Sequence, residues 1–173
     1  MRRALPWLLA AASGLTLALA LPGLGLWPLI LLFPGLLLET LERGRGRWRP
    51  WLLGWLAGTV HWAIATNWVV PVMHRYGGLP LVLAVGCLLG MAMILGSLWA
   101  LACGVTSMVP TAWRLWLFPT VWAVVQVLPR FPPFGFPWNE TASAFTGWPR
   151  LFLSAPVWGA TGLGWCVVAV GAG

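Results

Sequence analysis

The chain has 173 residues, of which 60% are hydrophobic and only 8% are charged. A soluble domain carries about 25% charged residues, so the composition excludes an ordinary soluble fold and predicts an integral membrane protein. The net charge of +7 is the balance of ten arginines and three glutamates, since lysine and aspartate are absent. No basic face with interleaved aromatic residues accompanies it, so we do not expect nucleic-acid binding.

Apolar stretches follow one another along the whole chain, separated by turns and short polar segments. We predict a single all-α transmembrane domain over residues 1–173, a bundle of about six helices. The predicted spans cover about residues 5–20, 24–38, 51–70, 79–109, 115–128 and 151–173. No internal repeat is evident, which counts against the duplicated architectures of many transporters.

The first predicted span has a second interpretation. Arg2-Arg3, the apolar run that follows and Ala18-Leu19-Ala20 together have the pattern of a cleavable signal peptide. The apolar pattern resumes directly after Pro22-Gly23, however, and this favours a tight helical hairpin.

The arginines predict the orientation of the bundle. If the loops alternate across the bilayer, one side carries Arg2, Arg3, Arg43, Arg45, Arg47, Arg49 and Arg114, and the other carries Arg75, Arg130 and Arg150. Cytoplasmic loops are the ones enriched in arginine and lysine, so the N-terminus is predicted to be cytoplasmic. The loops at residues 72–78 and 129–150 then face outward.

Few polar side chains fall inside the predicted spans. We expect His61, Asn67 and Gln126 each to form a hydrogen bond with a neighbouring helix, since an unpaired polar group in lipid is costly. A transporter or channel is the alternative, and its path would have to use these three residues.

Two glycine pairs and three cysteines also lie in apolar runs. The spacings Gly54-x-x-x-Gly58 and Gly86-x-x-x-Gly90 predict close approach of helices. The cysteines read as small buried hydrophobic residues, not as disulfides or metal ligands: Cys87, Cys103 and Cys166. We predict no metal, no cofactor and no catalytic residue in this chain.

The segment Pro129–Arg150 is rich in proline and aromatic residues. Its run from Phe131 to Trp138 cannot form an ordinary helix, because prolines interrupt it repeatedly. At the outer interface it could lie flat on the headgroups or line the mouth of a lipid-accessible cleft. A surface loop without a ligand is the plainer alternative.

Several of these landmarks together resemble the N-terminal membrane part of bacterial apolipoprotein N-acyltransferase. The matching segments are Leu21–Pro28, Tyr76–Pro80 and Gly135–Asn139, followed by Pro156, Gly159 and Gly162. The resemblance implies an enzyme of the bacterial inner membrane that transfers an acyl chain from a phospholipid to the N-terminal cysteine amine of a diacylated lipoprotein. It also implies membrane helices that frame a lateral opening for lipid substrates.

In that family the chemistry belongs to a nitrilase-like domain with a Glu-Lys-Cys triad. The present chain has no lysine and the resemblance stops before that domain, so we expect the chain alone to be inactive. It is then either a fragment or a shortened relative, for instance a non-catalytic anchor that binds a separate partner. By the same resemblance, Trp138 and Pro137, with Tyr76 and Gly77, are predicted to border the lipid or lipoprotein site.

Overall fold

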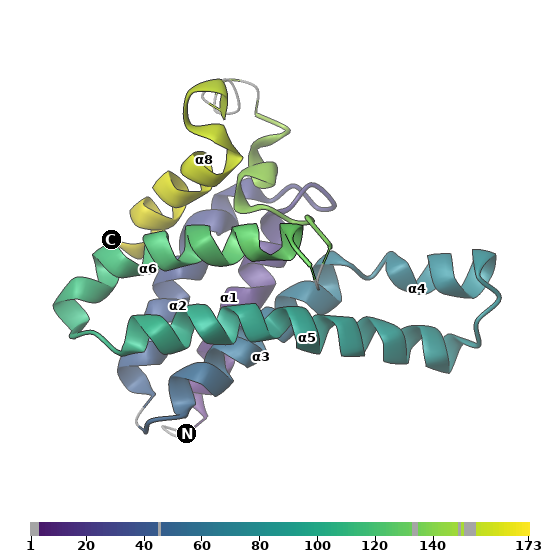
Figure 1. Ribbon diagram of the computed structural model, residues 1–173, viewed down its shortest axis with the longest axis horizontal. Helices are drawn as coiled ribbons and strands as arrows, with labels where there is room; N and C mark the ends of the chain where they lie inside the picture. The colour runs from purple at the N-terminus through teal and green to yellow at the C-terminus, as the bar shows by residue number, and fades with distance from the viewer. Residues whose placement is uncertain (1–3, 45, 133–134, 149, 151–154) are drawn as a thin grey trace.

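A computed structural model describes residues 4–44, 46–132, 135–148, 150 and 155–173, and these residues contain helices and no strand (Figure 1). The elements are α1 (Leu5–Ala20), η1 (Trp27–Leu31), α2 (Leu32–Arg43), α3 (Arg49–Ala65), α4 (Val69–Pro71), η2 (Val72–Tyr76), α5 (Leu81–Ser107), α6 (Thr111–Val127), η3 (Leu128–Arg130), η4 (Thr141–Phe145) and α8 (Ala155–Ala172). The predicted all-α fold class is therefore confirmed.

The helices differ in their ability to cross a bilayer. Among the described residues, only α5 is long and apolar enough to span one by itself, with 27 residues. At 1.5 Å per residue it is about 40 Å long, more than the ~30 Å of a hydrocarbon core. α1 and the segment Pro156–Ala172 are apolar but shorter. The six crossings and the cytoplasmic N-terminus remain predictions.

The second predicted span differs from the helix found there. Residues 24–26 are not helical, and Gly25 adopts a positive φ of 67° in the turn after α1. A 3₁₀ segment then leads into α2, which continues past Glu39 to Arg43. The extension is favoured by an ion pair between Glu39 and Arg43, four residues apart on the exposed face of the helix.

The third predicted span is interrupted, and the loop predicted after it is partly helical. α3 ends at Ala65, a turn follows, and the chain then continues as α4 and the π-helix η2. The Gly77 N–H donates to the carbonyl of Val72 at 3.2 Å, the five-residue spacing of a π-turn. The prediction of a loop beginning at residue 72 was wrong, because Pro71 sits in the first turn of α4–η2, where its missing N–H does little harm.

The last helix is bent at a glycine. Gly159 has φ 67° and ψ 170°, which breaks α8 into a short first turn and a longer second segment. The predicted final span began at residue 151, and residues 151–154 lie outside the described part of the chain.

α3 is the central helix, packed between α1 and α5. A Cβ added at Gly54 would lie 2.6 Å from the carbonyl oxygen of Trp99, and one at Gly58 would lie 2.7 Å from the Trp99 ring. The first predicted glycine pair therefore does permit close helix approach. The second glycine pair does not lie at a helix contact, because a Cβ at Gly86 or Gly90 would meet nothing within 4 Å.

An aromatic cluster fills the space where α2, α3, α5 and α6 meet. The Trp99 ring lies 4.7 Å from the Trp122 ring and 5.0 Å from the His61 imidazole, and Phe33 lies 5.0 Å from Trp122. All four side chains are buried. Offset and edge-to-face contacts of this kind add to the free energy already gained from burying large rings.

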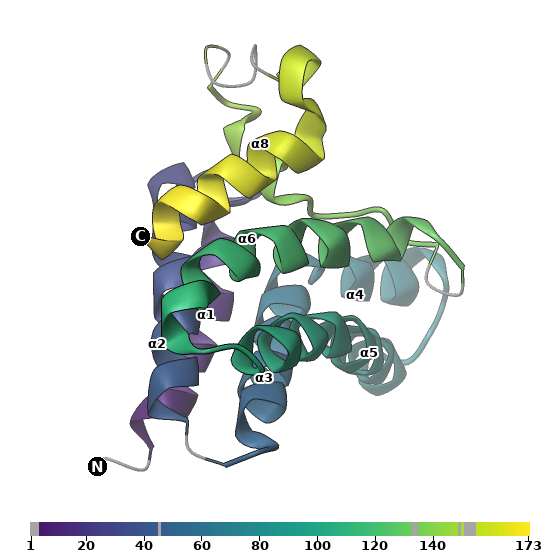
Figure 2. The same cartoon turned by 60° about the vertical axis from the view of Figure 1, so that its left-hand side comes forward.

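One part of the molecule projects from the rest. α4, η2 and the first half of α5 form a hairpin that extends away from the other helices (Figure 1), and the rotated view places it behind α6 (Figure 2). The hairpin exposes large apolar side chains from Leu81 to Leu83 and at Val72.

Candidate functional site

A cavity of about 830 Å³ opens at the end of the bundle where α1 and α3 terminate. Its walls are the turn Leu21–Leu24, the end of α3 with the turn after it from Ile64 to Trp68, the segment Pro137–Glu140, part of η4 and Ala160 of α8. Apolar groups make up most of the lining, and a few polar side chains lie among them. This is the composition expected of a ligand site for a largely apolar molecule.

Backbone geometry brings the proline-rich segment into this wall. Gly135 and Asn139 have positive φ values of 57° and 59°, so the backbone turns on either side of Phe136-Pro137-Trp138. A positive φ is uncommon outside glycine, although asparagine tolerates it better than most residues. The turned segment presents Pro137 and Trp138 to the cavity.

Trp138 forms part of an aromatic border. Its ring stacks on Phe136 with centroids 5.7 Å apart and planes 24° apart, and its centroid lies 5.7 Å from that of Trp68, in the turn between α3 and α4. The side chain is half exposed, at 50%. An indole in this position combines an apolar face with a polar N–H, which suits the boundary between lipid and water.

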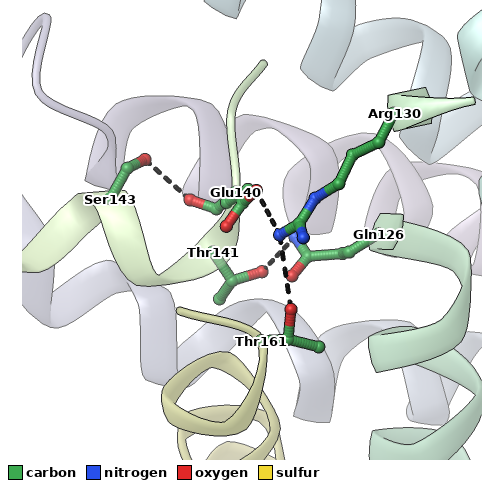
Figure 3. A network of polar contacts seen from close by, with 6 residues as sticks. All are labelled: Gln126, Arg130, Glu140, Thr141, Ser143 and Thr161. Atoms are coloured by element: carbon green, nitrogen blue, oxygen red, sulfur yellow. Dashed lines mark hydrogen bonds and ion pairs between the residues drawn. The ribbon is translucent and has the colours of Figure 1, made fainter. Parts of the chain in front are cut away.

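A polar network holds the segment Glu140–Ser143 against α6 and α8 (Figure 3). Thr141 Oγ1 accepts hydrogen bonds from Trp122 Nε1, at 3.0 Å, and from Gln126 Nε2. Arg130 forms an ion pair with Glu140 at 2.5 Å and donates to Thr161 of α8 at 3.4 Å. Two helices therefore fix the start of η4, and with it one wall of the cavity.

The polar residues predicted to bond between helices behave differently from one another. Gln126 bonds to Thr141 at the start of η4. His61 is buried beside α1, where a Cβ added at Gly14 would lie 3.1 Å from the His61 backbone nitrogen, and its Nδ1 has no hydrogen-bond partner. The prediction was wrong for Asn67, whose side chain donates to the Ile64 carbonyl at 2.9 Å in the turn that ends its own helix. Asn67 lines the large cavity, whereas His61 and Gln126 do not.

The predicted site residues fall into two places. Pro137 and Trp138 lie together in the cavity wall. Tyr76 and Gly77 lie at the end of the projecting hairpin and are not among the residues that line the cavity; Tyr76 is 87% exposed. The structure thus brings the first pair together and leaves the second pair outside.

Sequence reasoning missed three other parts of the wall: Trp68, Asn139 and the turn Leu21–Leu24. Trp68 lies near the end of the third predicted span, where a tryptophan at the membrane interface is ordinary. Only its pairing with Trp138, distant in the sequence, distinguishes it. Asn139 could have been predicted from the sequence, because it directly follows the run Gly135–Trp138, where a turn residue is expected.

Cysteine chemistry does not contribute to this cavity. Cys103 is buried and Cys166 half-buried, as predicted for small hydrophobic residues, but Cys87 is exposed on the projecting part of α5. Its burial was wrongly predicted because an apolar run does not reveal which face has a neighbour. In the part of the chain that the structure describes, no group of three histidine, cysteine or acidic side chains is arranged to hold a metal.

Known proteins similar to this chain point to one family. Residues 13–173 match the family model of the apolipoprotein N-acyltransferase N-terminal domain. Two relatives named apolipoprotein N-acyltransferase, from Verminephrobacter eiseniae and Caulobacter vibrioides, are 32% and 30% identical over 92% and 95% of this chain. A third, from Azotobacter vinelandii, is 30% identical over 76% of it. The chain spans 31%, 32% and 26% of these relatives, so about a third of their length at most.

Proposed function

Because the chain belongs to the apolipoprotein N-acyltransferase N-terminal domain family, we propose that it is the membrane-embedded part of such an enzyme. In this proposal residues 1–173 form one transmembrane domain of six spans in the bacterial inner membrane, with a cytoplasmic N-terminus. The substrates are a phospholipid acyl donor and a diacylated lipoprotein. The acyl transfer itself needs a catalytic domain with a lysine, and this chain contains none.

The exposed apolar surface supports the membrane assignment. Valines, leucines and tryptophans are exposed along α5, at the start of α6 and on α8, for instance Val82, Trp116 and Trp158. Neighbouring exposed side chains such as Leu81, Val82 and Leu83 are unusual on a soluble protein, whereas lipid tails cover them without cost. Introducing reporter tags before residue 4 and into the loop near residue 147 tests the topology. Opposite sides are expected, and tags on the same side would contradict the six-span arrangement.

The proposed substrate site depends on one observation, the cavity of about 830 Å³. We propose that it receives part of a lipid substrate, with Pro137 and Trp138 at its border. The mostly apolar lining suits acyl chains, and the few polar groups from Asn139 to Ser143 suit an ester or headgroup. Tyr76 and Gly77, on the projecting hairpin, would then meet lipid or lipoprotein outside the cavity.

Substitution of Trp138 tests this role. The domain would be joined to the remaining part of a full-length relative, and acyl transfer to a diacylated lipopeptide would be measured. Trp138→Ala removes the ring that stacks on Phe136 and faces Trp68, so we expect at least a tenfold loss of kcat/KM, about 1.4 kcal/mol. Trp116→Ala is the matched control, because Trp116 is exposed on α6 and does not line the cavity.

Equal activity of the two variants would show that Trp138 does not border the substrate site. A separate assay of the isolated 173-residue chain tests whether acyl transfer requires a catalytic domain outside this chain. No acylation is expected from it, and any turnover would contradict the view that the chemistry lies in another domain.

A further inference from the structure

A second, much smaller cavity of about 20 Å³ lies inside the aromatic cluster. Its lining includes Leu17 of α1, His61 and Trp62 of α3, and Trp99 of α5. Trp138, Asn139 and Glu140 line it as well, and the same three residues line the large cavity. One short segment therefore separates the two spaces.

Unpaired polar atoms concentrate around this small cavity. Among the residues that the structure describes, the buried side-chain atoms without a hydrogen-bond partner include His61 Nδ1, Trp62 Nε1 and Asn139 Nδ2, and all three residues line it. His61 is 1% exposed and Trp62 is 4% exposed. Because buried polar atoms are nearly always paired, three such atoms at one space indicate a bound polar partner.

The three atoms have complementary hydrogen-bonding roles. Trp62 Nε1 and Asn139 Nδ2 are donors. His61 Nδ1 has no hydrogen-bond partner. A neutral imidazole protonated at Nε2 presents a lone pair at Nδ1, and the two donors that share the cavity favour this tautomer. The cavity therefore offers two donors and one acceptor.

We propose that this cavity binds a single water molecule, which accepts hydrogen bonds from Trp62 and Asn139 and donates one to His61. A water needs roughly 10–15 Å³ of such space and two to four polar partners, and both conditions are met here. A larger ligand would not fit. The water links α3 to the segment that forms one wall of the large cavity, and this link does not depend on the proposed enzymatic function.

Magnetisation transfer from water to the indole protons tests the proposal on the full 173-residue chain in lipid nanodiscs. Tryptophan would be labelled with ¹⁵N, and cross-peaks would be recorded in the laboratory and rotating frames, which separates direct transfer from chemical exchange. We expect the Trp62 indole proton to show a cross-peak to a long-lived water. Trp55, seven residues earlier on α3, is the control, because its indole N–H donates to the Met93 carbonyl at 3.0 Å. Trp62→Phe and Trp55→Phe assign the two signals.

Absence of the Trp62 cross-peak in the unsubstituted chain would overturn the proposal, whatever the variants do. A second arm replaces the acceptor. His61→Phe removes the lone pair, so we expect the cross-peak to fall at least threefold. His61→Gln, which keeps a polar group at the cavity, should retain it. A cross-peak that keeps its full strength in His61→Phe would refute the part assigned to His61.

Discussion

The first half of α5 is more apolar than the second, which contains Ser97, Thr106 and Ser107, yet the first half is the more exposed of the two. In the first half, Val82 is 82% exposed and only a narrow stripe of Ala84, Leu88 and Ala92 is buried. In the second half, Trp99 is buried in the aromatic cluster and Cys103 is completely buried. α3 and α6 pack against α5, and the Trp55 indole of α3 reaches as far as the Met93 carbonyl. The part of α5 that lies in the projecting hairpin runs beside α4 and η2 (Figure 1). Hydrophobicity thus predicts that a residue avoids water, and it does not predict what covers it.

The glycines of α5 provide one of the two largest expected effects in this comparison. A Cβ at Gly96 would lie 2.7 Å from Thr59 Oγ1 and 2.8 Å from the Thr59 backbone nitrogen, whereas one at Gly86 would meet nothing within 4 Å. Gly96→Leu should therefore force α3 and α5 apart and cost about 3 kcal/mol or more. Gly86→Leu should leave stability nearly unchanged. Unfolding in mixed micelles measures both, and equal losses would contradict the difference between the two halves.

Truncating one large side chain in each half of α5 compares the two halves in a second way. Trp99→Ala would empty the space between Phe33, His61 and Trp122, so we expect a loss of about 3–5 kcal/mol in the free energy of unfolding. Ile94→Ala, in the exposed half, leaves no cavity and should cost less than about 1 kcal/mol. A loss at Ile94 as large as that at Trp99 would mean that a protein surface, not lipid, covers the hairpin.

A smaller effect is expected where the segment Glu140–Ser143 is hydrogen-bonded to α6. Thr141→Val removes the oxygen that accepts from Trp122 and Gln126, leaving two donors unpaired at a cost of about 1–3 kcal/mol. Thr146→Val is the matched control, because the exposed Thr146 hydroxyl donates to the nearby Ser143 carbonyl, at 3.0 Å, and so bonds within its own turn. It should change stability by less than about 0.5 kcal/mol. Comparable losses would show that the network does not secure the segment.

Much of the helical layout follows from local patterns. The predicted spans at 5–20 and 79–109 correspond to α1 and α5, since a long apolar run bounded by glycine or proline has few alternatives to a helix. The interruption at residues 66–68 and the π-helix that follows could not be predicted in this way. They depend on how the freed backbone groups are satisfied, which local propensity does not report.

The site was predictable only where its members are neighbours in the sequence. Pro137 and Trp138 stand in an unusual proline and aromatic run, which drew attention to them. Trp68 and the turn Leu21–Leu24 complete the cavity from distant segments, and nothing near them in the sequence indicates that role. Tyr76 and Gly77 were grouped with Trp138 by resemblance alone, and the hairpin carries them away from the cavity.

The sequence by itself determined that this chain is helical and apolar, and it placed a rigid proline and aromatic segment between the fifth and sixth apolar runs. These properties follow from composition and from spacing along the chain, which fold-specific contacts do not alter. Only the tertiary structure decided which half of α5 is covered, that Trp68 faces Trp138, and that His61, Trp62 and Asn139 surround one small cavity. Those outcomes depend on close packing between residues far apart in the sequence, where a single glycine or a turn of positive φ sets which surfaces meet.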